Sequence, residues 1–219
     1  MLDLRPPVIY QITSGTTTAQ TTPKDPQFVN ILGSIQAAVD ARVSLFQIRE
    51  KALSGHALYE LTADGAEITR GSNTRLLVND RADIARAAGA DGVHLTSQSL
   101  PAVVVRETCG PDFLIGVSTH SREEAIAARG AGADFVVFGP VFETESKRVF
   151  GEPQGLEGLR AVAKALIGFP VVAIGGISLE NVAACFHAGA RGIAAIRLFS
   201  EAEKLSPVVN VIRSHFKDE

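Results

Sequence analysis

The chain has 219 residues, a formal net charge of −3 and 46% hydrophobic residues, the composition of an ordinary globular protein. Nucleic-acid-binding proteins usually carry a clustered basic face, and this mildly acidic composition gives no sign of one. We therefore expect no nucleic-acid partner. No apolar run approaches the roughly 20 residues of a membrane helix, and the start lacks a secretory signal. Cys109 and Cys185 lack CxxC spacing. Together these features predict a cytoplasmic protein.

Short apolar runs recur along the whole chain, and each is followed by a segment of helical period. Most of these runs are apolar throughout, as expected of parallel strands that are covered on both faces. The predicted strands are 8–13, 44–50, 75–80, 91–95, 113–119, 134–141, 170–177 and 192–199.

The one low-complexity stretch is SGTTTAQTTPKDPQ at 14–27, after the first predicted strand. It is polar and rich in Thr and Pro, so we expect it not to pack. Two interpretations stay open: a mobile flap over the site, or a solvated insertion without a role.

Three serines are predicted to begin helices. Ser121 stands three residues before Glu124, the spacing of a capping box. Ser178 is a candidate N-cap for LENVAACFHAG, and Ser206 precedes Pro207, which suits the first position of a helix.

A weak repeat joins helices to strands at three places: AGADGV at 88–93, AGADFV at 131–136 and AGARGI at 188–193. In each, the glycine is expected to end a helix in the left-handed conformation before the next strand begins. Repeated βα units across one chain favour a single-domain (β/α)8 TIM barrel over the alternative, an open doubly wound sheet.

Polar residues gather where the predicted strands end. In a barrel these ends share one mouth, where active sites are built. Four of these residues are cations that together suit a multiply charged anion such as a diphosphate, although any single one could instead pair with Glu50, Glu143 or Glu145. These cations are Arg49, Lys51, Lys147 and Arg197.

The stretch AIGGIS places Gly175 and Gly176 at a strand end, directly before Ser178. Bare backbone amides beside a helix start can form a nest for phosphate, and the seventh strand of a barrel is a usual place for one.

Two further groups could do chemistry at this mouth. Asp80, next to Asn79, could hold Mg²⁺ or could cap the following helix. His120, after Ser118, could act as a general acid or base, whereas His94 is expected to be a hydrogen-bonded barrel histidine.

The motifs of the strand ends resemble the thiamine phosphate synthase family, in order and spacing over nearly the whole chain. The matching stretches are QIREK (47–51), LLVNDRADIARAAGADGVHL (76–95), IGVSTHS (115–121), DFVVFGPVFETESK (134–147), QGLEGL (154–159) and VVAIGGIS (171–178).

The resemblance implies a (β/α)8 barrel, often dimeric, that joins hydroxymethylpyrimidine diphosphate to thiazole phosphate with Mg²⁺. It implies that Gln47 contacts the pyrimidine and that Asp80 binds Mg²⁺. It assigns the diphosphate to Arg49, Lys51, Asn79, Ser118 and Lys147, and the thiazole phosphate to Thr144, Ser146, Gly175 and Gly176.

The sequence departs from the family at three places. Ser99 stands where the synthases usually carry a second acidic Mg²⁺ ligand, Ile196-Arg197 replaces a Val-Ser pair, and Glu143 replaces a proline. Arg197 could grip the phosphate directly or fill its space.

These departures keep two alternatives open. The sister branch of thiazole tautomerases transfers a proton on thiazole carboxylate phosphate and would use His120, but it tends to lose the residues matching Gln47 and Lys51. The other alternative is a non-catalytic binder of thiamine precursors. The retained diphosphate residues favour the synthase.

Overall fold

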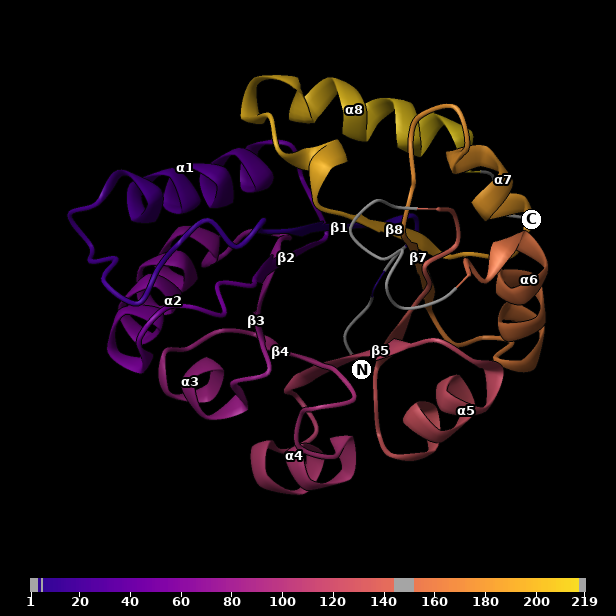
Figure 1. The fold of residues 1–219 in the computed structure, drawn as a ribbon, viewed down its shortest axis with the longest axis horizontal. Helices are drawn as coiled ribbons and strands as arrows, with labels where there is room; N and C mark the ends of the chain where they lie inside the picture. The colour runs from indigo at the N-terminus through magenta and orange to yellow at the C-terminus, as the bar shows by residue number, and fades with distance from the viewer. Residues whose placement is uncertain (1–3, 5, 144–151, 217–219) are drawn as a thin grey trace.

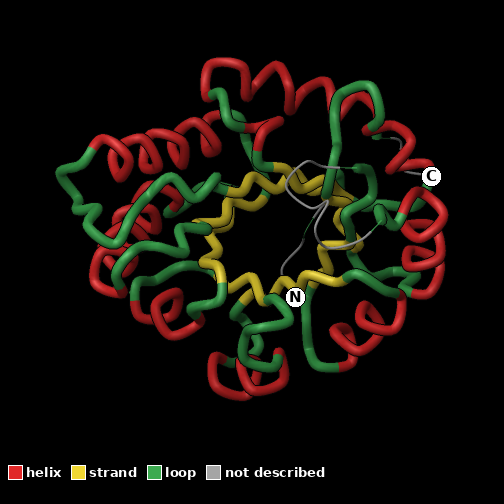
Figure 2. The backbone as a smooth tube through the Cα atoms, viewed as in Figure 1, coloured by secondary structure: helices red, strands yellow, loops and turns green. Residues whose placement is uncertain are grey.

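The computed structural model describes residue 4, residues 6–143 and residues 152–216. In this part of the chain, eight parallel strands close into a barrel in chain order, and β8 pairs back onto β1. Helices follow the strands and surround the barrel (Figures 1 and 2). The predicted (β/α)8 barrel is therefore confirmed, and the open sheet is excluded. No helix in the described ranges is long and apolar enough to cross a membrane.

The strands are short and the helices vary in length. The strands are β1 (Val8–Ile12), β2 (Leu45–Ile48), β3 (Arg75–Asn79), β4 (Gly92–Leu95), β5 (Leu114–Thr119), β6 (Phe135–Phe138), β7 (Val171–Ile174) and β8 (Gly192–Ala195). The helices are α1 (Pro26–Asp40), α2 (Gly55–Thr69), α3 (Ala82–Ala87), α4 (Ala102–Cys109), α5 (Arg122–Gly130), α6 (Gly155–Ala165), α7 (Val182–His187), η2 (Arg197–Phe199) and α8 (Ala202–His215).

The last three strands end earlier than predicted. The structure ends β6 at Phe138, before Gly139-Pro140, and ends β7 at Ile174, before two glycines. Proline has no N–H for the strand ladder, so the chain leaves the sheet there. After β8 the chain turns into the short helix η2.

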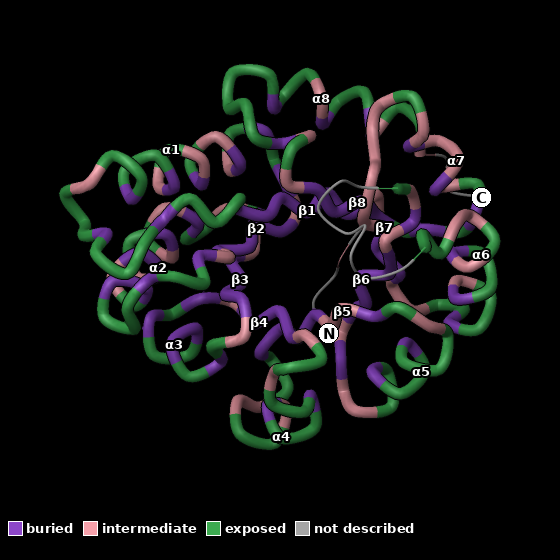
Figure 3. Tube along the Cα trace, viewed as in Figure 1, coloured by how far each residue is buried: buried purple, intermediate pink, exposed green. Residues whose placement is uncertain are grey.

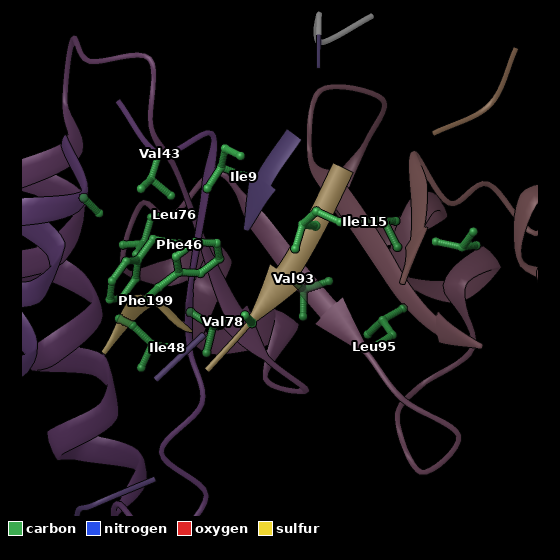
Figure 4. Close-up of a cluster of buried hydrophobic side chains, with 14 of the residues drawn as sticks. Ile9, Val43, Phe46, Ile48, Leu76, Val78, Val93, Leu95, Ile115 and Phe199 are labelled. Carbon is green, nitrogen blue, oxygen red and sulfur yellow. The ribbon is translucent and has the colours of Figure 1, made fainter. Parts of the chain in front are cut away.

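Alternating strand residues build two cores. Tyr10, Leu77 and Phe135 belong to the cluster inside the barrel. Residues of the other strand face, such as Phe46 and Val78, pack between the sheet and the helices (Figure 4). Figure 3 shows the strands almost wholly buried, with exposed positions on the outer helices and loops. This rigid frame fixes where each strand end lies.

The three predicted helix-to-strand joints form at the barrel end opposite the mouth, here called the bottom. Gly89, Gly132 and Gly189 have φ of 79°, 92° and 93°, the left-handed conformation expected of a helix stop.

In two of these joints an aspartate ties neighbouring strands together. The Asp91 carboxylate accepts from the Leu76 N–H at 2.8 Å, and that of Asp134 accepts from the Ile115 N–H at 2.7 Å. Arg106 donates to the same Asp134 oxygen at 2.7 Å and to the carbonyls of Gly110, Phe113 and Gly132. Polar groups at the bottom are thus paired with one another.

The predicted helix starts have mixed outcomes. Ser121 accepts from the Glu124 N–H at 3.1 Å, as the capping box requires, while Glu124 reaches back to the His120 N–H. The other two predictions are wrong. A turn separates Ser178 from α7, and α8 begins at Ala202, because good helix formers precede Pro207 and extend the helix upstream of it.

The loop after β1 is packed rather than loose. The Glu50 carboxylate, on a residue only 3% exposed, accepts from the N–H groups of Gly15 and Thr17 at 3.1 and 3.0 Å. The Thr17 hydroxyl adds a third bond of 2.7 Å, and Thr17 and Thr21 are both buried. The expectation that residues 14–27 do not pack is therefore wrong at Thr17, where a buried carboxylate satisfies the loop's donors, and at the buried Thr21.

Candidate functional site

Polar side chains from four neighbouring strands meet inside the mouth of the barrel. Gln47 on β2 donates through Nε2 to the Asn79 Oδ1 on β3, at 3.2 Å. His94 on β4 and Ser118 on β5 are joined between Nε2 and Oγ at 2.8 Å. These residues face inward because strand side chains alternate and their neighbours pack outward against the helices. The sequence prediction that these strand ends share one mouth is confirmed for these four side chains.

Arg49 stands next to this polar group. It is half-buried, and its backbone N–H is held by the Thr13 hydroxyl at 2.8 Å. Burial is the main cause of the lowered pKa of His94, and the charge of Arg49 is the second cause. Within residues 4, 6–143 and 152–216, no carboxylate forms an ion pair with Arg49 or with the exposed Lys51. Within that part of the chain, therefore, no carboxylate neutralises these two cations.

The structure gives the position of only some of the other side chains that were predicted to bind an anion. Arg197 lies in η2, beyond the end of β8, and is exposed. Three predicted residues, Thr144, Ser146 and Lys147, lie outside the described residues. Glu145, a proposed partner for the cations, lies there too.

Asp80 has a backbone conformation that is rare for a residue with a side chain. Its φ is 67°, the left-handed region, where Asp is tolerated better than most residues. Its carboxylate accepts a hydrogen bond from the hydroxyl of Ser99. The side chain does not cap α3, whose N-cap residue is Arg81 and which has no side-chain cap bond, so the capping alternative is wrong. The strained backbone aims this carboxylate away from the helix.

A cavity of about 310 Å³ opens beside Asp80, between the loops after β2 and β3. Its rim carries Glu50, Lys51 and Asp80, and Leu53 and Leu58 form part of its apolar wall. The described residues contain no group of three His, Cys, Asp or Glu side chains placed to hold a metal ion. Asp80 and Ser99 offer oxygen donors only, which suits a cation that takes its other ligands from a phosphorylated substrate.

Gly175 and Gly176 are packed against the loop after β6. Both have positive φ, and a Cβ on Gly175 would lie 2.6 Å from the Pro140 Cα. A Cβ on Gly176 would lie 2.7 Å from the Glu143 carbonyl oxygen. Close packing alone thus requires glycine here. The helix start expected directly after them is absent, since α7 begins only at Val182.

His120 is exposed at the end of β5. Its Nδ1 lies 2.5 Å from the Gly139 carbonyl oxygen, which can only accept, so Nδ1 carries the proton. In the singly protonated ring, Nε2 is then left as an acceptor.

His94 differs from the expected satisfied histidine. It is 4% exposed, and burial together with the nearby Arg49 lowers its pKa to about 3. Its Nδ1 has no hydrogen-bond partner among the described residues, and neither does the hydroxyl of the buried Tyr10. Sequence reasoning missed this, and it also missed that Glu50 holds the first loop. For His94 the available signal was a titratable residue inside the otherwise apolar run GVHL, whereas nothing local marked the role of Glu50.

Comparison with known proteins identifies the family. The model of the thiamine monophosphate synthase family matches residues 19–199. A putative thiamine-phosphate synthase of Geobacter sulfurreducens is 47% identical over 76% of this chain and 78% of its own length. A thiamine-phosphate synthase of Chlorobium phaeovibrioides is 46% identical over 72% of this chain and 75% of its own.

A solved structure agrees with these relatives. The thiamine phosphate pyrophosphorylase of Pyrococcus furiosus superposes with a TM-score of 0.78 at 32% identity, covering 94% of each chain. The family match and the relatives agree with the strand-end motifs that meet at the barrel mouth. The chain belongs to the thiamine monophosphate synthase family.

Proposed function

We propose that this protein is a thiamine phosphate synthase, a transferase of thiamine biosynthesis. It joins hydroxymethylpyrimidine diphosphate to thiazole phosphate and releases pyrophosphate. The observation that carries the proposal is the convergence of Gln47, Asn79 and Ser118 with the cation Arg49 at one barrel mouth. Relatives that are 46–47% identical and named as synthases support it.

The reaction requires charge stabilisation on a leaving group. As the carbon–oxygen bond to the diphosphate breaks, negative charge grows on pyrophosphate and a pyrimidine-methyl cation forms. Arg49, Lys51 and Lys147 stabilise that growing charge more than the charge of the ground state, which lowers the barrier. Asn79 and Ser118 donate hydrogen bonds to the same oxygens.

The second substrate supplies the new bond. The thiazole nitrogen attacks the methylene carbon and forms the carbon–nitrogen bond, so the electron pair lost to pyrophosphate is replaced. Gln47 orients the pyrimidine from inside the barrel. Gly175 and Gly176, with Thr144, Ser146 and Arg197, hold the thiazole phosphate and thereby position the nucleophile.

Mg²⁺ is part of the proposal. Asp80 would hold the ion together with diphosphate oxygens, and the Ser99 hydroxyl lies close enough to orient that carboxylate. Bound there, the ion supplies positive charge against the leaving oxygens. With one carboxylate instead of two, we expect a higher Mg²⁺ requirement than a site with both ligands would have.

The test is pyrophosphate release with both precursors over a range of Mg²⁺ concentrations. We expect Mg²⁺-dependent release by the wild type and its near loss in Arg49→Gln. Arg122→Gln, on the exposed side of α5, is the matched control and should retain the rate. Absence of release at every Mg²⁺ concentration would remove the synthase assignment.

The tautomerase alternative rests on His120, whose Nε2 is left as an acceptor. It gives no task to Lys51, Asn79 or Asp80, so we rank it second. His120→Asn should abolish isomerisation of thiazole carboxylate phosphate if this alternative holds, and the same variant tests whether His120 contributes to pyrophosphate release. We further propose that the protein is cytoplasmic and forms a homodimer. Light scattering of the purified protein tests the dimer.

A further inference from the structure

His94 and Ser118 form a pair in which each atom's role can be worked out. The His94 ring is buried and reaches the Ser118 Oγ through Nε2, at 2.8 Å. Ser118 is partly exposed at the end of β5, one layer nearer the mouth. Because β4 and β5 are paired with His94 opposite Gly116, the ring lies beneath the serine hydroxyl.

The ring is held by its neighbours. The Tyr10 ring lies 5.7 Å from it between centroids, at 56°, and the Phe135 ring lies 6.4 Å away, at 45°. Gly116 leaves the space that Phe135 fills, since a Cβ there would come within 2.3 Å of the Phe135 ring. Such packing fixes the direction of Nε2 toward Ser118.

The neutral ring has one N–H, and its position decides what Ser118 can do. With the proton on Nδ1, a buried donor would have no partner among the described residues, and Nε2 would accept the only proton of Ser118. With the proton on Nε2, the ring donates to Oγ instead. The serine proton then stays free to point into the mouth.

We propose that His94 is a positioning residue that donates from Nε2 to Ser118 and so keeps the serine hydroxyl as a donor to an anionic oxygen of the ligand. This rests on the proposed function, in which Ser118 contacts the diphosphate. Orphaned N–H groups are rarer in proteins than unpaired acceptors, which favours this tautomer. Filling one lone pair of the hydroxyl also polarises its O–H bond, which strengthens the bond to the anion.

The first test needs no activity. Long-range ¹H–¹⁵N spectra of the ¹⁵N-histidine-labelled wild type should show His94 with its proton on Nε2, assigned by the signal lost in His94→Gln. A proton on Nδ1 would overturn the proposal whatever the enzyme does.

The second test measures the affinity for inorganic pyrophosphate with Mg²⁺, by calorimetry, and kcat/KM for pyrophosphate release. Ser118→Ala should weaken binding about 10- to 100-fold, the effect of one hydrogen bond to a charged group. His94→Phe should lose a similar factor, and the double variant should lose no more than either single one. His94→Gln, whose Nε2 amide can donate in the same direction, should recover most of the loss.

Additive losses in the double variant, with circular dichroism showing folded proteins, would contradict the proposal. So would His94→Gln behaving like His94→Phe. The two proposals fail separately: a wild type that binds pyrophosphate with the Nε2 tautomer but releases none keeps this inference and loses the synthase. A wild type that releases pyrophosphate but carries the His94 proton on Nδ1 keeps the synthase assignment and loses this inference.

Discussion

The two ends of the barrel differ in how completely their polar groups are paired. At the bottom, the carboxylates of Asp91 and Asp134 accept from backbone N–H groups and from arginines, so the described polar groups there are paired. At the mouth, Asp80 has a positive φ. Among the described residues, His94 Nδ1 has no hydrogen-bond partner and Arg49 has no carboxylate partner. Paired polar groups thus stabilise this fold, while unpaired ones mark where a ligand is expected.

The largest expected effect is at the mouth, where a substitution should lower activity and leave stability almost unchanged. Arg49→Gln should lower kcat/KM for pyrophosphate release by about 100- to 1000-fold, because a group that stabilises the developing charge is lost. The free energy of unfolding should change by less than about 0.5 kcal/mol, since no described ion pair is broken. Urea denaturation with the activity assay measures both. A large loss of stability would contradict the comparison.

The next-largest effect is expected at the bottom of the barrel, where a substitution should lower stability and leave activity unchanged. Asp134→Ala should reduce the free energy of unfolding by about 1–3 kcal/mol, because the Ile115 N–H and Arg106 lose their acceptor. The activity of the folded fraction should stay near the wild-type value. Asp64→Ala, an exposed position on α2, is the matched control and should be within about 0.5 kcal/mol. Equal effects in both variants would show that the joint does not contribute.

A pH effect follows from His94. Burial, together with Arg49, lowers the pKa of His94 from 6.5 in the unfolded chain to about 3 in the folded protein. Between these pH values the unfolded state therefore binds more protons than the folded state. The stability contribution is complete above about pH 6.5 and is lost as the pH falls, at up to about 1.4 kcal/mol per unit. Urea unfolding of wild type and His94→Phe at pH 5 and 7 compares the slopes. An identical pH dependence in both proteins would mean that His94 is not buried in its neutral form.

The smallest predicted effect concerns Ser99. Ser99→Asp places a second carboxylate beside Asp80 and should lower the Mg²⁺ concentration for half-maximal rate several-fold, since Mg²⁺ binds through one or two carboxylates. Ser99→Asn is the matched control of similar size and should not do so. An unchanged Mg²⁺ dependence in Ser99→Asp would place the ion elsewhere.

The sequence predicted most of the frame and part of the mouth. Periodicity and the three repeated glycine joints sufficed for the barrel, because helix stops and apolar strands are local signals. Gln47, Asn79 and Ser118 were expected at the mouth because they stand at the ends of predicted strands. The bond from Glu50 to Thr17 and the unpaired Nδ1 of His94 could not be predicted, because they depend on which distant side chains the closed sheet brings together.

Predictions from local sequence also failed at positions where tertiary packing determines the structure. Ser178 and Ser206 have the chemistry of N-caps, yet the helices begin elsewhere. The glycines of AIGGIS suggested a phosphate nest, and the structure supplies a packing reason for them as well.

The contact between Gly175-Gly176 and the chain from Pro140 to Glu143 has a consequence for engineering. Val141 and Phe142 donate backbone hydrogen bonds to Ile174 and Gly175, at 2.8 and 3.0 Å, so the loops after β6 and β7 are interlocked main chain to main chain. A graft that exchanges one of these loops alone would leave its partner without matching acceptors or clearance. Chimeras of this barrel therefore need both loops taken from the same donor.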